Sequence, residues 1–297
     1  MEVNGLSEAR QQEMLLKERK ANSAWKKLKR NKSAMFGLWV VLFVTIVSIF
    51  GPMIVKTDPA AMDFIHLDSK PGENGFILGT DTMGRDILAR LVYGGRVSLL
   101  VAVGGMIVGA AIGILLGLVS GYAGGTVDAV LMRIMDGMSA FPFVLLALML
   151  MTVLGAGMKN VILSIGIASV PGYARMARGQ VLVVKNEDYI KAEKALGALN
   201  SRIIFRHLLP NIVSSLIVYA TLNVASAILT EASLSFLGMG ITPPQVSWGS
   251  ILKEGQECIR SASHVATFSG IAIFITVLGF NLLGDGIRDV LDPKMKK

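Results

Sequence analysis

The chain has 297 residues, of which 53% are hydrophobic and 17% charged, and its mean hydropathy is +0.59. Soluble globular proteins carry about 25% charged residues, so this composition predicts a membrane protein. The net charge of +8 would also fit nucleic-acid binding. Basic patches with interleaved aromatic side chains are missing, however, which excludes nucleic acid as a partner. The single cysteine, Cys258, excludes an internal disulfide.

Six membrane spans are predicted along the chain. Residues 1–33 are polar and basic and are expected to form a cytosolic tail. Residues 34–96 hold a first span, an uncharged run at 34–55, and then a polar extracytoplasmic segment. An apolar run of this length crosses a hydrocarbon core of about 30 Å, and only a helix satisfies its own backbone there. The remaining spans are predicted at 97–121, 130–155, 160–180, 211–236 and 265–284.

This pattern indicates an all-α integral membrane fold with six transmembrane helices. A core domain would cover residues 97–284, and a cytosolic tail would follow at 285–297. An even number of spans places both termini on one side of the membrane. If that side is the cytosol, most of the 29 Lys and Arg residues lie in inner segments. The positive-inside rule therefore predicts cytosolic termini.

Glycines recur every fourth residue through the second predicted span. On a helix this spacing makes one smooth stripe, which allows another helix backbone to come close. Chance is the competing explanation in a chain with 32 glycines, but five in register favour helix packing. The stripe consists of Gly105, Gly109, Gly113, Gly117 and Gly121.

The inner loop between spans four and five is predicted to hold a short helix, a glycine turn and a second helix. Asn186 is a suitable helix cap, and Tyr189 to Leu196 are good helix formers. Gly197 fits the position just past the helix end, and Pro210 marks the entry to span five. Such a helix can lie on lipid head groups, pack on its own protein or dock into a partner's groove.

Ala192, Gly197 and the pair Leu209–Pro210 match a known loop motif. They resemble the signature of bacterial ABC importer permeases, in which Glu-Ala-Ala is followed by glycine and later by Leu-Pro. Lys191 and Glu193 stand where that motif has Glu and the second Ala. The resemblance implies that this loop forms the coupling helix, which docks on the ATP-binding subunit.

Further segments narrow the resemblance to the permeases of dipeptides, oligopeptides and nickel. Together they cover nearly all of residues 30–295, and they are similar to the C-type subunit, which pairs with a longer B-type subunit. The matching segments are Gly79–Leu99, Gly121–Asp136, Gly238–Gly249 and Asn281–Pro293.

The resemblance implies a permease subunit in the cytoplasmic (inner) membrane of a bacterium, importing dipeptides or oligopeptides. Its partners would be membrane lipid, a homologous B-type permease, two cytosolic ATPase subunits and an extracytoplasmic substrate-binding protein. ATP and Mg would bind to the ATPase subunits, and this chain would bind no cofactor and catalyse no reaction. In agreement, no lysine directly follows a glycine, so a phosphate-binding loop is missing. The residues expected to dock on the ATPase are Tyr189, Ala192, Glu193, Ala195, Leu196, Gly197, His207, Leu209 and Pro210.

Two other functions stay open on the sequence alone. Nickel or another small solute is an alternative cargo within the same family. An ion-coupled secondary transporter is an alternative class, which needs ionisable residues deep in the spans and helices broken at the midplane. Asp136 in the third predicted span is either a functional acid or one half of a structural pair with an arginine.

Overall fold

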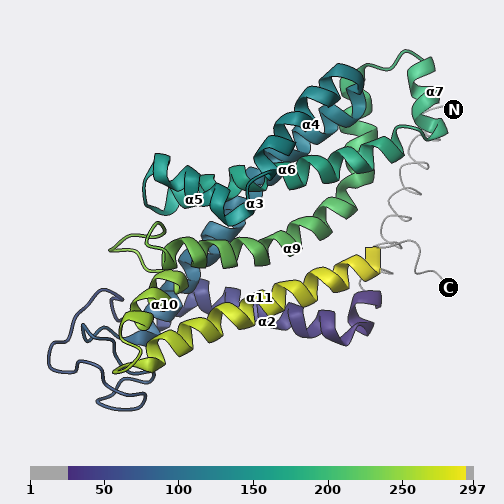
Figure 1. Cartoon of the computed structure of the whole chain (residues 1–297). Helices are drawn as coiled ribbons and strands as arrows, with labels where there is room; N and C mark the ends of the chain where they lie inside the picture. The colour runs from purple at the N-terminus through teal and green to yellow at the C-terminus, as the bar shows by residue number, and fades with distance from the viewer. Residues whose placement is uncertain (1–25, 292–297) are drawn as a thin grey trace.

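The computed structural model describes residues 26–291, and within this range the chain forms helices and no strands (Figure 1). Helix η1 is a π-helix, and it joins α8 to α9 without a break. In chain order the elements are α2 (Lys32–Ile54), α3 (Ile87–Ala123), α4 (Gly125–Ser139), α5 (Phe143–Leu154), α6 (Met158–Val184), α7 (Asp188–Ala195), α8 (Asn200–Arg202), η1 (Ile203–Leu208), α9 (Leu209–Phe236), α10 (Trp248–Glu257) and α11 (Ser263–Leu291).

Four of the described helices are long and apolar enough to cross a membrane. They are α2, α3, the continuous helix Asn200–Phe236, and α11. The α4–α5 pair is long and apolar enough only when its two bent helices are counted together, which gives up to five spans by length and composition. The described residues therefore show a polytopic helical membrane protein.

The third predicted span, 130–155, is not one helix. α4 ends at Ser139, α5 begins at Phe143, and the two are bent by 89° relative to each other. Pro142 explains the break, because proline lacks an N–H and disfavours helical geometry in the residue before it. Its backbone has φ −53° and ψ 138°, outside the helical region.

Other boundaries also differ from the predicted ones. α3 begins at Ile87, ten residues before the predicted second span, and has 37 residues. Such a helix is about 55 Å long, so it extends beyond a hydrocarbon core of about 30 Å. The predicted fourth span lies within α6, which has 27 residues but is less apolar than the four long helices named above. Much of α6 is buried, so its surface does not need to suit lipid.

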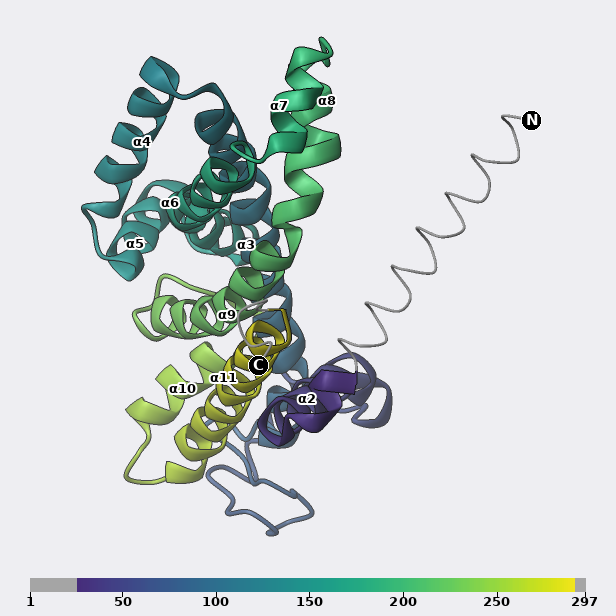
Figure 2. The same ribbon diagram turned by 90° about the vertical axis from the view of Figure 1, so that its right-hand side faces the viewer.

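Helix α9 lies between two groups of helices. Figures 1 and 2 show α4, α5 and α6 on one side of α9, and α2, α10 and α11 on the other. α3 packs against α6 along its length and also contacts α9 and α2. One buried core, which includes Ile165, Ile228 and Trp248, joins these helices. A smaller core around Leu118, Val181 and Ile190 lies beneath α7.

The stripe Gly105, Gly109, Gly113, Gly117 and Gly121 is buried and faces α6. A Cβ atom on Gly113 would lie 2.5 Å from Tyr173 Cβ and 2.7 Å from the Val170 carbonyl oxygen. These distances are too short for van der Waals contact, so the two backbones come as close as they do only because α3 has no side chain there. The stripe is therefore the seam between α3 and α6.

We expect Gly113→Leu to destabilise the protein in detergent by about 1–3 kcal/mol or more, because the new side chain overpacks against the α6 backbone. Thermal unfolding of the purified chain measures this effect. Gly179→Leu on α6 is the matched control, because nothing lies within 4 Å of a Cβ atom built on that exposed glycine. Equal stability of the two variants would contradict the close α3–α6 seam.

Candidate functional site

The loop between α6 and α9 is folded against the helix bundle. Ile190 of α7 is fully buried, and it belongs to the apolar cluster that contains Leu118 of α3 and Val181 of α6. Ile203 and Leu208 of η1 join the same cluster. The Ile190 side chain therefore packs α7 against α3 and α6, the two helices of the glycine seam.

Gly197 ends α7 in a Schellman arrangement. Its φ is +79°, a conformation that side chains disfavour. The Gly197 N–H donates to the carbonyl of Lys194, and the Ala198 N–H donates to the carbonyl of Glu193, both at 3.0 Å. The chain reverses at this point, and α8 begins at Asn200.

Polar contacts hold α7 against the helix that follows it. Asn211 Nδ2 donates to the Tyr189 hydroxyl oxygen at 3.1 Å, and burial together with nearby Glu187 raises the pKa of the Tyr189 phenol. His207 Nε2 lies 3.5 Å from Glu193 Oε1. Tyr189 thus holds α7 to α9 through a hydrogen bond, and Glu193 lies beside His207 within the loop.

Two leucine side chains at the turn between α7 and α8 are exposed. The exposed fraction is 85% for Leu196 and 74% for Leu199. Ala192, Ala195 and Gly197 are exposed beside them. An exposed apolar patch on an ordered segment is typical of a protein or membrane contact.

Of the nine residues expected to dock on the ATPase, six lie in α7 and the turn after it, His207 lies in η1, and Leu209 and Pro210 begin α9. They fall into two groups by their surroundings. Ala192, Ala195, Leu196, Gly197 and Pro210 are exposed, whereas Glu193, His207 and Leu209 are half-buried. Tyr189 is exposed and also hydrogen-bonded to Asn211.

Two ion pairs connect α4 to α6. Arg178 donates to both carboxylate oxygens of Asp128, at 2.5 and 2.6 Å. Arg175 Nη1 donates to Asp136 Oδ1 at 3.3 Å, and Arg175 Nη2 donates to the Ser139 hydroxyl. Asp136 therefore pairs with an arginine of the neighbouring helix.

A buried ionic cluster lies at the opposite end of the molecule from α7. Asp81 accepts from Arg90 and, at 2.7 Å, from Arg85. Glu254 of α10 lies 2.6 Å from Arg85 Nη2 and 2.7 Å from Arg90 Nη1. The cluster joins the segment before α3 to α10. Sequence reasoning missed it, because the partners are up to 169 residues apart.

Glu231 joins three helices at the same end. Its carboxylate is fully buried and accepts from Ser98 of α3 at 2.9 Å and from Ser235 of α9 at 2.8 Å. Ser98 in turn accepts from the Trp248 backbone N–H, at the start of α10. These contacts are between residues of α3, α9 and α10, so they form only in the folded protein.

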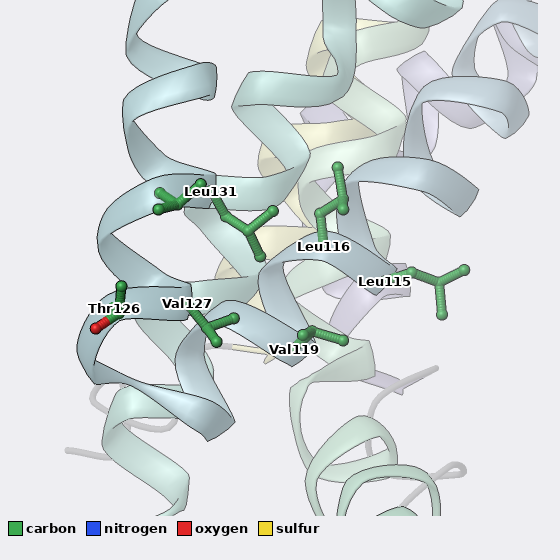
Figure 3. Close-up of a pocket in the computed structure, with 7 residues that line it drawn as sticks. Leu115, Leu116, Val119, Thr126, Val127 and Leu131 are labelled. Atoms are coloured by element: carbon green, nitrogen blue, oxygen red, sulfur yellow. The ribbon is translucent and has the colours of Figure 1, made fainter.

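An apolar groove of about 530 Å³ runs between α3 and α4. Figure 3 shows its lining, which is aliphatic apart from one threonine. Such a lining suits contact with lipid acyl chains. The lining residues are Leu115, Leu116, Val119, Thr126, Val127, Val130 and Leu131.

The fold and the structured loop define a polytopic helical membrane protein, and comparison with known proteins gives its family. Residues 113–297 match the family described as "Binding-protein-dependent transport system inner membrane component". Residues 21–71 match the "N-terminal TM domain of oligopeptide transport permease C". The chain belongs to this family of inner membrane components, and within it to the ABC importer permeases of the peptide class.

Curated relatives match the chain over most of its length. The glutathione transport system permease protein GsiD of Pectobacterium atrosepticum is 42% identical over 274 residues, which are 92% of this chain and 90% of the relative. The di/tripeptide transport system permease protein DppC of Pseudomonas aeruginosa is 40% identical over 277 residues, 92% and 91% of the two chains. A solved structure of the MetNI methionine ABC transporter, inward facing, is similar with a TM-score of 0.57 and 22% identity. It covers 68% of this chain and 96% of its own, and it shows the shared fold.

We expect Arg90→Met to lower the stability of the purified chain by about 3–5 kcal/mol, because it leaves Asp81 buried with less charge compensation. Thermal unfolding in detergent is the measurement. Arg96→Met is the matched control on the same helix, because Arg96 is exposed. Adding Asp81→Asn to Arg90→Met should restore part of the loss. An Arg90 variant as stable as the Arg96 variant would contradict a structural role for the cluster.

Proposed function

We propose that this chain is one transmembrane subunit of an importer of dipeptides or oligopeptides, powered by separate ATPase subunits. The observation that carries the proposal is the ordered loop 186–210, which holds two exposed leucines at the turn that follows α7, a helix anchored in the bundle by Ile190. The family gives this loop its context, and the relatives named for glutathione and dipeptide transport support a peptide cargo. Nickel or another small solute is the alternative cargo.

The proposed topology has six crossings with both termini in the cytosol. The bent α4–α5 pair supplies the third crossing and α6 the fourth, since 27 helical residues extend about 40 Å. In Figure 1, α7, the start of α2 and the end of α11 lie toward one end, and the segment between α2 and α3 lies toward the other. The basic residues of the inner segments support a cytosolic location for the α7 end.

The proposed assembly follows from what this chain lacks and what it exposes. Its sequence contains no phosphate-binding loop, so ATP and Mg would bind to two cytosolic ATPase subunits. A B-type permease would complete the membrane part, in a bacterial inner membrane. The extracytoplasmic segment 55–86, fixed by the Asp81 cluster, would face the substrate-binding protein.

Coupling would pass from the ATPase to the spans through α7. Leu196 and Leu199 would insert into a groove on the ATPase subunit, as an amphipathic helix does in its target. Movement of α7 would reach α3 and α6 through Ile190, which packs in the same cluster as Leu118 and Val181. Because α3 and α6 are tightly packed, they would respond together.

We expect Gly197→Val to leave the chain inserted in the membrane but to weaken ATPase binding or uncouple hydrolysis from uptake. A β-branched residue at φ +79° is strained by roughly 1–2 kcal/mol, which would turn Leu196 and Leu199 away from their groove. Membrane level, ATPase co-purification and peptide uptake should be measured together, with nickel uptake as a parallel assay.

Gly197→Asn is the matched control, because asparagine tolerates positive φ. It should keep more coupling than the valine variant. If Gly197→Val has the membrane level, ATPase co-purification and peptide uptake of the wild type, this loop has no role in coupling.

A further inference from the structure

A polar hollow lies where the break between α4 and α5 meets α6 and α9. Its volume is about 360 Å³, and it is lined at the α4–α5 break by Ser139 and Pro142 and on α6 by Arg175. Tyr219 and Asn223 line it from α9. α6 spans residues 158–184 and α9 spans 209–236, so most of this lining comes from the middle of each helix.

The lining is unsuited to lipid. A guanidinium and an amide facing hydrocarbon at this depth would be costly, and charged groups inside spans therefore face a water-filled path or a protein partner. The groove of Figure 3 is the contrast, because its lining is aliphatic apart from Thr126. The polar hollow thus has the character of a surface that faces water or another protein, as the wall of a path for a hydrated molecule does.

Arg175 is the one charged side chain among the residues that line this hollow. Arg175 donates to Asp136 and Ser139, which uses two of the five N–H groups of its guanidinium. The α5 helix begins beside it without a side-chain cap, and the first N–H groups of a helix favour a nearby anion. The hollow therefore suits a carboxylate.

Another carboxylate can take the place of Asp136, the present partner of Arg175. The Asp136 contact is long, at 3.3 Å, and the side chains of Arg175 and Asp136 are 45% and 54% exposed. A pair with this exposure contributes little free energy. An incoming carboxylate can replace Asp136 without leaving a buried charge unpaired.

We propose that Arg175 binds the carboxylate terminus of the peptide as it passes the middle of the membrane. This inference rests on the proposed peptide importer and names the group of the cargo that the permease itself contacts. The hollow is at the small end of the range of ligand pockets, about 300–1,000 Å³. It therefore receives one end of a peptide, with Phe141, Phe143 and Leu146 offering apolar surface beside the charge.

The test is protection of a cysteine in the hollow of the complete importer in membrane vesicles. Asn223→Cys is made in a Cys258→Ser background and labelled with a maleimide, in the presence of dialanine or dialanine amide. Dialanine should slow labelling and the amide should not, because only dialanine has the carboxylate. In Arg175→Gln the dialanine concentration that halves the labelling rate should rise about tenfold, as expected for loss of a charge-assisted hydrogen bond.

Arg133→Gln is the matched control, because it removes an equal charge from an exposed position on α4. It should leave protection unchanged. Arg175→Lys should retain part of the protection, and it serves if the glutamine variant does not assemble. Equal protection by dialanine and its amide, or no effect of Arg175→Gln, would overturn the proposal.

Dialanine uptake by the same vesicles separates the two proposals. An importer that takes up dialanine but shows no carboxylate-dependent protection contradicts the role of Arg175 alone. An importer that takes up no peptide contradicts the proposed cargo.

Discussion

The backbones of α3 and α6 lie close together along the glycine stripe of α3. In a membrane, helices associate through packing, because lipid is as apolar as their side chains. The glycines of α3 allow the backbone of α6 to lie against it, with Tyr173 and Val170 next to Gly113. α6 carries Arg175 and α3 carries Leu118, so this seam fixes the polar hollow relative to the cluster beneath α7.

The seam connects the loop to the polar hollow, which is part of the transport path in our proposal. Ile190 links α7 to α3 and α6, and Arg175 and Arg178 link α6 to α4. The α4–α5 break lies beside this second link, at Pro142. A broken helix at mid-height is also a feature of secondary transporters. Family membership, and not the break, identifies the chain as an ABC importer permease.

The sequence predicted those features that depend on local patterns. Long apolar runs located the helices, and Gly197 with its flanking helix formers indicated the helix–turn–helix loop. The 89° bend was missed, because Pro142 marks a break but its angle depends on packing. The Asp81–Arg90–Glu254 cluster was missed for a related reason, since residues distant in the chain meet only in the folded protein. The low hydropathy of α6 is explained by its burial among the other helices, which the sequence does not show.

In the proposed mechanism, transport energy comes from ATP hydrolysed on other chains and enters through α7. Proteoliposomes that contain this chain and its partner permease, with the ATPase subunits present or omitted, provide the test. We predict that uptake of a peptide delivered by the binding protein requires both the ATPase subunits and ATP. Uptake that proceeds without the ATPase subunits and follows an imposed ion gradient would contradict this account.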